Sequence, residues 1–286
     1  MAGRTAGRWN WLFVPGGPGL GSESLCGLAE TAQVPGTTWL VDLPGEGSNR
    51  DLPGLPDDPF ALWPGVRVEA AQALDDVVMV GHSTGAMFML SVPELEAHLV
   101  GMTLVSGAPH AGWRSAFGQY AQEHPIPEVD AAAQAYVEHP NDVNLRALTL
   151  AAAPWNFTED SLPEGRFLLS GLPYNHEATS WADAHFDDTY QARWVPQTIP
   201  TLILGGAQDR IVTQSLWQEE SAFTRPNILH HRVPGAAHFP WIENPESVRV
   251  AFADLVDRLN ASAPPPLPRG HTSNAPPSTE TTAPVE

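Results

Sequence analysis

The sequence predicts an α/β fold in which a mostly parallel sheet of about six strands carries helices on both faces. Short apolar runs rich in Val, Ile and Leu alternate with helical patterns along most of the chain. Such alternation is typical of a parallel sheet that is buried on both sides. The stretch 108–197 has no strand pattern, which predicts a helical insertion after the fourth strand of this chain.

The elements follow one another in a simple order. The expected strands cover residues 11–14, 37–42, 77–80, 100–106, 200–205 and 227–233. The helices expected around them cover residues 22–32, 66–74, 84–91 and 246–259, and the last of these is amphipathic. The sheet domain is therefore expected at 9–107 plus 198–260. Ligands bind at the carboxyl edge of such sheets, so we expect the insertion 108–197 to form a cap or lid.

Charge restricts the partners. The chain has 33 acidic and 14 basic side chains, all of the latter arginine, and a formal net charge of −19. A chain this acidic repels nucleic-acid phosphates and anionic membrane surfaces, so neither is an expected partner. The sequence leaves the oligomeric state open.

Other features bear on location and order. Cys26 stands alone, so no intrachain disulfide is expected, and no apolar run approaches the roughly 20 residues of a membrane span. The start of the chain lacks the pattern of a secretory signal, and we expect a cytoplasmic protein. Residues 261–286, rich in Pro, Ser and Thr, are predicted to be a disordered tail.

The sharpest motif is Gly81-His82-Ser83-Thr84-Gly85, a G-x-S-x-G run between an expected strand and an expected helix. A serine on such a tight turn is exposed at the edge of the sheet, and small residues flank it because the turn leaves no room for side chains. A serine hydroxyl needs a base to accept its proton before it is a good nucleophile. The motif therefore predicts Ser83 as a nucleophile.

His238 is the predicted base. It follows the last strand, so its loop can return the ring to the same sheet edge, and imidazole exchanges protons near neutral pH. His82 adjoins Ser83, but adjacent side chains on a sharp turn point apart. His230 and His231 lie within a strand and are expected to face opposite ways. A metal site from these two with His238 lacks supporting acid or cysteine spacing, and no metal is expected.

Asp209 is the predicted carboxylate that orients the imidazole. It follows the apolar strand and Gly205-Gly206 at a strand's carboxyl end, and gives the chain order Ser83, Asp209, His238 that this elbow type requires. Asp42 and Glu243 are the rival acids.

Acyl transfer also needs donors for the developing oxyanion. One is expected at the N–H of Thr84, the residue after the nucleophile, and the other at Gly17 in the loop after the first strand. A dinucleotide site at the same glycines is disfavoured, because Pro18 removes a donor and no suitable acid follows a second strand.

Together these motifs resemble the α/β-hydrolase superfamily. In order along the chain they are Pro15-Gly16-Gly17-Pro18-Gly19, 42–48, 81–85, 205–209 and the run from His238 through Glu243 to Pro245. The first is similar to the His-Gly-Gly-Pro-Gly signature of proline iminopeptidases, with Pro15 in place of histidine. The chain starts at what would be the family's third strand, so the first strands, including the antiparallel one, are expected to be absent or reduced. The resemblance implies the α/β-hydrolase fold, an oxyanion donor at Gly17, a cap over the serine and no cofactor.

The sequence thus predicts a cofactor-free serine hydrolase that acts on a small ester, lactone or related acyl compound. Aromatic side chains in the insertion suggest that the substrate has an apolar part; they are Trp113, Trp155, Trp181, Trp194, Phe117, Tyr120, Phe157, Phe167 and Tyr174.

Two other functions stay open. A proline-iminopeptidase-like aminopeptidase would hold a free amine with acids of the insertion, such as Glu123, Glu128, Glu138, Glu159 or Glu164. Arg114, Arg166 or Arg193 could instead hold a substrate carboxylate. A catalytically silent member used for binding is the other alternative.

Overall fold

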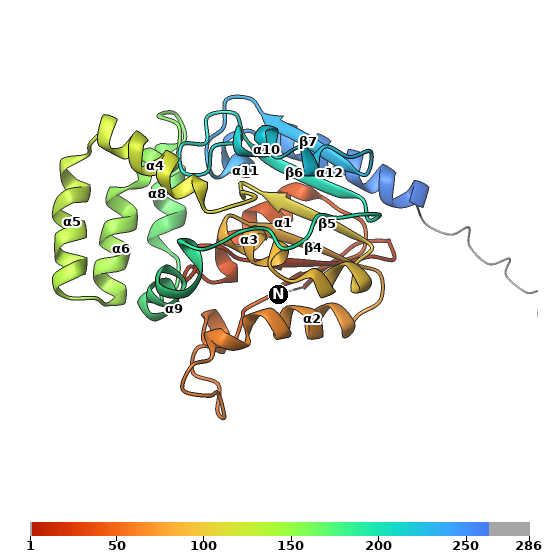
Figure 1. Ribbon diagram of the computed structural model, residues 1–286, viewed down its shortest axis with the longest axis horizontal. Coiled ribbons are helices and arrows are strands. Elements are labelled where there is room, and N and C mark those ends of the chain that lie inside the picture. The colour runs from red at the N-terminus through yellow and green to blue at the C-terminus, as the bar shows by residue number, and fades with distance from the viewer. Residues whose placement is uncertain (1, 263–286) are drawn as a thin grey trace, which may run out of the picture.

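The computed structural model describes residues 2–262, which form a seven-stranded sheet in the order β1-β3-β2-β4-β5-β6-β7 (Figure 1). The strands are β1 (Ala2–Arg4), β2 (Asn10–Val14), β3 (Thr37–Leu40), β4 (Val77–His82), β5 (Gly101–Val105), β6 (Thr201–Gly206) and β7 (Ile228–Val233). Every residue of β4, β5 and β6 is buried, as expected of central strands in a parallel sheet.

β1 is the strand that the sequence analysis did not locate. It pairs antiparallel with β3 through Ala2–Trp39, Gly3–Thr38 and Arg4–Thr37, whereas all other neighbouring strands are parallel. The sheet therefore starts before residue 9, and its antiparallel strand is reduced to three residues. Because β1 is additional, the insertion follows the fifth strand of the chain and not the fourth.

Helices cover both faces of the sheet. The α-helices are α1 (Cys26–Ala32), α2 (Trp63–Gln72), α3 (Thr84–Leu90), α4 (Gly112–Glu123), α5 (Pro127–Glu138), α6 (Asp142–Ala151), α7 (Ala153–Asn156), α8 (Leu162–Ser170), α9 (His176–Ala182), α10 (Leu216–Glu219), α11 (Pro240–Glu243) and α12 (Pro245–Ser262). Short 3₁₀ turns are η1 (Ser22–Leu25), η2 (Gly47–Asn49), η3 (Phe60–Leu62), η4 (Pro93–His98) and η6 (Ser221–Phe223), and η5 (Asp183–Asp187) is a π-helix.

The two faces have separate apolar cores. Successive side chains of a strand point to opposite faces, so Trp11 and Phe13 of β2 pack with α1 and α12, whereas Leu12 packs with Trp63 of α2 and Phe88 of α3. Figure 1 shows α2 and α12 on opposite sides of the sheet. This packing holds the carboxyl ends of β2, β4, β6 and β7 along one edge.

The segment between β5 and β6 forms α4 to α9 and η5, and Figure 1 shows its helices grouped at one end of the sheet. Asp142, at the start of α6, links it to the β3–α2 connection through Arg50 and joins α6 to α9 within the insertion. Asp142 accepts from Arg50 Nη1 at 2.7 Å and from both the backbone N and the ring Nδ1 of His176, at 2.8 and 2.9 Å. The segment is thus fixed to the β3–α2 connection.

The end of α12 changes one expected boundary. The helix continues to Ser262, so residues 261 and 262 are helical and do not belong to a disordered tail. The rest of that predicted tail, 263–286, lies outside the described residues. Within residues 2–262 no helix has the length and apolar character needed to cross a membrane.

Candidate active site

Ser83 lies at the sharp turn between β4 and α3. Its backbone has φ 52° and ψ −125°, a conformation that non-glycine residues rarely adopt and that surrounding contacts must hold. Ser83 N donates to Val105 O at 2.8 Å. A Cβ on Gly81 would lie 2.7 Å from Ala86 N, and one on Gly85 would collide with Pro15 O, so both flanking positions require glycine.

His238 faces Ser83 from the loop between β7 and α11. Its Nε2 lies 3.1 Å from Ser83 Oγ, and its Nδ1 lies 3.0 Å from Asp209 Oδ2 and 3.2 Å from Oδ1. The carboxylate can only accept, so His238 Nδ1–H donates to it and Nε2 is left to accept from the serine hydroxyl. Three segments distant in sequence therefore form one continuous hydrogen-bonded chain.

Asp209 is fixed by its own loop after β6. Its Oδ1 accepts from the backbone N of Ile211 at 3.0 Å and of Val212 at 2.9 Å. Its side chain is fully buried, and that of His238 is 5% exposed. Oδ2 is thereby directed at His238, and water is excluded from the pair.

The loop between β2 and η1, residues 15–21, runs past Ser83, and we call it the glycine loop. Gly17 has φ +118° and Gly19 has φ +92°, both in the region that favours glycine. Two carbonyls of this loop accept hydrogen bonds from the insertion. Thr179 Oγ1 of α9 donates to Pro18 O at 2.7 Å, and the backbone N of Asn175, the residue before α9, donates to Gly19 O at 2.9 Å. Thr84, the first residue of α3, has no helical acceptor for its N–H.

A cavity of about 210 Å³ opens above Ser83. The insertion supplies part of its wall through Trp113, Leu145, Thr149, Asn156, Leu169 and Thr179. The remaining lining residues are Gly17, Pro18, Leu20, His82, Ser83, Thr84, Ile211, His238 and Phe239. None of these fifteen lining residues is an Asp, Glu, Arg or Lys. Of the aromatics that the sequence analysis singled out in the insertion, Trp113 is the one among the lining residues.

The model of the alpha/beta hydrolase family matches residues 5–251 of this chain. The chain belongs to that family. Pimeloyl-(acyl-carrier protein) methyl ester esterase of Xylella fastidiosa (strain M12) is 26% identical over 248 residues, which are 81% of this chain and 89% of the esterase. Together with the family, this similarity to an esterase makes the chain a hydrolase.

Two solved structures have the same fold. A proline iminopeptidase-related protein from Thermus thermophilus superposes with a TM-score of 0.68 at 18% identity, covering 92% of this chain and 94% of that one. A thermophilic esterase from Thermogutta terrifontis superposes with a TM-score of 0.64 at 18% identity, covering 91% and 93%. Both similarities extend over the insertion as well as the sheet, since they cover nine-tenths of the chain.

The rival acids of this hydrolase have other partners. Asp42 accepts from the backbone of Ser22 and Ser48 at 2.9 Å each. Glu243 accepts from Ala237 N at 2.5 Å and from Thr158 N at 2.7 Å. The structure therefore brings Asp209, and neither rival, to His238.

The neighbouring histidines also have separate roles. The His82 ring bonds a backbone carbonyl: its Nε2–H donates to His238 O at 3.0 Å. Burial and the nearby His238 ring hold the pKa of His82 well below its usual value, so the ring is neutral. Sequence reasoning missed this contact because the motif does not show where the carbonyl of a residue 156 positions later lies.

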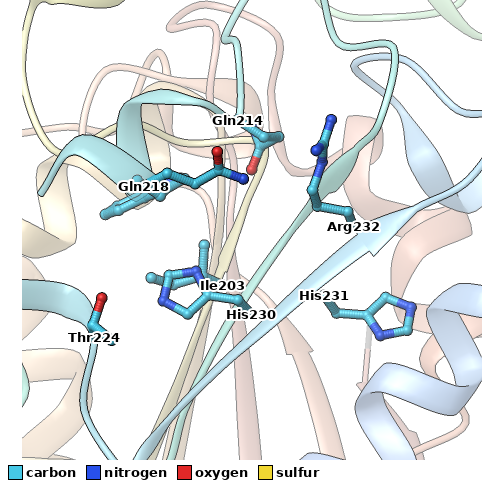
Figure 2. Close-up of a pocket in the computed structure, with 8 residues that line it drawn as sticks. Ile203, Gln214, Gln218, Thr224, His230, His231 and Arg232 are labelled. Carbon is cyan, nitrogen blue, oxygen red and sulfur yellow. The ribbon is translucent and has the colours of Figure 1, made fainter. Parts of the chain in front are cut away.

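Figure 2 shows the rings of His230 and His231 on opposite sides of β7. His230 Nε2–H donates to Phe223 O at 3.0 Å, and His231 Nε2 lies 2.8 Å from Ser247 Oγ. His230 lines a separate small cavity of about 140 Å³ with Gln214 and Gln218. Residues 2–262 contain no group of three or more His, Cys, Asp or Glu side chains placed to hold a metal ion.

Glu243 has a further contact that the sequence did not indicate. By joining Ala237 N to Thr158 N it connects the loop that carries His238 to the end of α7, and His238 N itself donates to Asn156 O at 3.0 Å. Burial raises the pKa of Glu243, although the two N–H donors oppose this. The insertion therefore braces the histidine loop as well as the glycine loop.

Proposed function

We propose that this hydrolase is a serine esterase of small uncharged esters or lactones, with Ser83, His238 and Asp209 as its catalytic residues. The observation that supports it best is the unbroken chain of contacts from Ser83 Oγ through His238 to Asp209, which opens on the cavity. The similarity to a methyl ester esterase supports an ester as the substrate.

The proposed reaction has two halves. Ser83 Oγ attacks the ester carbonyl while His238 Nε2 takes the hydroxyl proton, and Asp209 stabilises the resulting imidazolium. The tetrahedral intermediate collapses, the carbon–oxygen bond to the leaving alcohol breaks, and His238 returns the proton to that alcohol. Water, deprotonated by the same Nε2, then cleaves the acyl-serine and restores the hydroxyl.

The developing oxyanion needs hydrogen-bond donors that are already in place. We assign these to the N–H groups of Gly17 and Thr84, since both residues line the cavity beside Ser83. The contacts of α9 with the glycine loop keep that backbone from moving as charge develops.

Cavity size and lining support a small, uncharged substrate. At about 210 Å³ the cavity is smaller than the roughly 300–1,000 Å³ usual for drug-sized ligands, so the acyl and alcohol parts are small. The absence of charged side chains among its lining residues favours an uncharged molecule, since an unpaired charge is costly to desolvate. We propose that the inserted helices act as the cap over this site and that the sheet forms the other domain.

An aminopeptidase of the proline-iminopeptidase kind is the second candidate, favoured by the Pro15–Gly19 loop and by the structural similarity to a related protein. It would need a carboxylate to hold the substrate ammonium. None of the five glutamates considered from the sequence, and none of the three arginines, lines the cavity. Equal turnover of a free and an N-blocked prolyl amide would remove this candidate.

The deciding experiment compares Ser83→Ala with Ser91→Ala on nitrophenyl esters of increasing acyl length, together with labelling by a fluorophosphonate probe. Ser91, at the other end of α3, bonds Met87 O and is the matched control. We expect Ser83→Ala to lose labelling and hydrolysis and Ser91→Ala to keep both. Equal labelling of the two variants would end the proposal.

A further inference from the structure

Two opposite charges are buried in the protein beside the glycine loop. Glu46, in the β3–α2 connection, is 2% exposed, and Arg67 of α2 is 1% exposed. A Glu46 carboxylate oxygen accepts a hydrogen bond from the backbone N–H of Gly19. This bond joins the loop that carries Gly17 to the segment after β3.

Arg67 is enclosed by aromatic rings. Its guanidinium carbon lies 4.7 Å from the ring centre of Phe88 and 5.8 Å from that of Trp63. Within the described part of the chain, Nε, Nη1 and Nη2 have no hydrogen-bond partner. An isolated buried cation is strongly unfavourable, so a nearby opposite charge must offset it. Glu46 makes no hydrogen bond with Arg67 in the described part of the chain, but its negative charge raises the pKa of Arg67.

The charges affect each other's ionisation. Burial raises the pKa of Glu46 to about 7, opposed by the Gly19 N–H and by Arg67, while Asp42 acts in the same direction as burial. Burial lowers the pKa of Arg67 to about 9, and Glu46 opposes it. Each charge therefore favours the charged form of the other, against the effect of burial.

The backbone of the glycine loop depends on other segments for its position. Gly16, Gly17 and Gly19 have no side chains, so the loop backbone is held through contacts from outside it. The insertion holds the carbonyls of Pro18 and Gly19, and Glu46 holds the N–H of Gly19. Gly19 is two residues from Gly17, so a shift at Gly19 is transmitted to the proposed oxyanion donor.

We propose that Glu46 is a positioning residue for the Gly17 oxyanion donor, because its side-chain oxygen holds the backbone N–H of Gly19. The inference rests on the proposed function, because it needs an oxyanion at Ser83. Glu46 is not among the cavity-lining residues, so its loss should lower kcat and leave KM nearly unchanged.

The test uses two double variants with identical charge. Glu46→Gln with Arg67→Met removes both charges but keeps an oxygen acceptor for Gly19 N–H. Glu46→Met with Arg67→Met removes both charges and the acceptor. Removing both partners of a buried pair avoids leaving one charge unpaired, so both proteins are expected to fold.

We expect kcat on a nitrophenyl ester to be about 10- to 100-fold lower in the Met/Met protein than in the Gln/Met protein, because displacing the Gly17 N–H by about 1 Å costs a factor of this size. The KM values of the two proteins should agree within about threefold. Leu259→Ala, in α12 next to Gly101 at the far end of the sheet, is the stability control, which should lower Tm without lowering kcat. Equal kcat in the two double variants would overturn the proposal.

A second readout does not depend on activity. In ¹⁵N-glycine-labelled wild type, the amide proton shift of Gly19 should titrate with a midpoint near 7, following Glu46, and this titration should vanish in the protein with Glu46→Gln and Arg67→Met. No titration in the wild type would refute the hydrogen bond itself. If hydrolysis proves independent of Ser83, the proposed function and the positioning role fail together, while a persisting Gly19 titration shows that the contact alone survives.

Discussion

Replacing Asp209 by asparagine tests the proposed chemistry with little change in shape. Two backbone donors, Ile211 N at 3.0 Å and Val212 N at 2.9 Å, point at Oδ1. The amide oxygen of the asparagine must stay there, because an NH₂ group would face two N–H donors. The NH₂ is thereby forced into the Oδ2 position, 3.0 Å from His238 Nδ1.

An NH₂ group at that place can only donate, so His238 Nδ1 must accept and its proton moves to Nε2. Nε2 then faces Ser83 Oγ at 3.1 Å as a donor and cannot take the serine proton. The expected loss in kcat is about 10⁴-fold, which corresponds to about 5 kcal/mol of transition-state stabilisation. Steady-state hydrolysis of a nitrophenyl ester measures it.

The control is Asp58→Asn, because Asp58 bonds Ala61 N and Trp181 Nε1 at the surface, away from His238. It should keep wild-type kcat. Asp209→Asn should also keep nearly the wild-type Tm, since both backbone donors to Oδ1 remain bonded. A kcat within tenfold of wild type for Asp209→Asn, in a folded protein, would refute the tautomer argument.

Two further substitutions probe how the insertion is attached. Glu243→Gln leaves either Thr158 N or Ala237 N facing an NH₂ group, so one of the two hydrogen bonds is lost. We expect the free energy of unfolding, measured in urea, to fall by about 1–3 kcal/mol. An unchanged free energy of unfolding would show that Glu243 does not hold the two segments together. For Asp142, burial alone would raise the pKa, but the bonds from Arg50 and His176 outweigh it and lower the pKa to about 2. The unfolded chain binds this proton near pH 4, so the stabilisation is complete above that pH and disappears as the pH falls toward 2. The Tm difference between wild type and Asp142→Asn should therefore shrink over this range, and a difference independent of pH would exclude the ion pair as its source.

Local sequence was enough to locate Ser83, Asp209 and His238. Each follows a strand, and the carboxyl ends of parallel strands meet along one edge, so strand context placed all three on the same side of the fold. The requirement for glycine at positions 81 and 85 also followed from the turn itself, because backbone crowding there does not depend on distant residues.

The short strand β1 and the burial of Glu46 and Arg67 could not be predicted from local sequence. β1 has only three residues and no apolar alternation, and it is a strand because β3 offers it an unpaired edge. Glu46 and Arg67 are charged, and a charged residue in a sequence is normally expected at the surface. Their burial depends on Phe88, Trp63 and the glycine loop meeting at one point.

The amino-acid sequence alone therefore determined the fold class and the elements that carry the candidate residues, because hydrophobic period and turn chemistry act over a few neighbours. The tertiary structure decided which donors and acceptors meet: Asp209 and not Glu243 at His238, an uncharged cavity under the insertion, and Glu46 on Gly19 N–H. Gly19 and Glu46 are 27 positions apart and Asp209 and His238 are 29 apart, and only the packing of whole layers brings such distant atoms within hydrogen-bond distance.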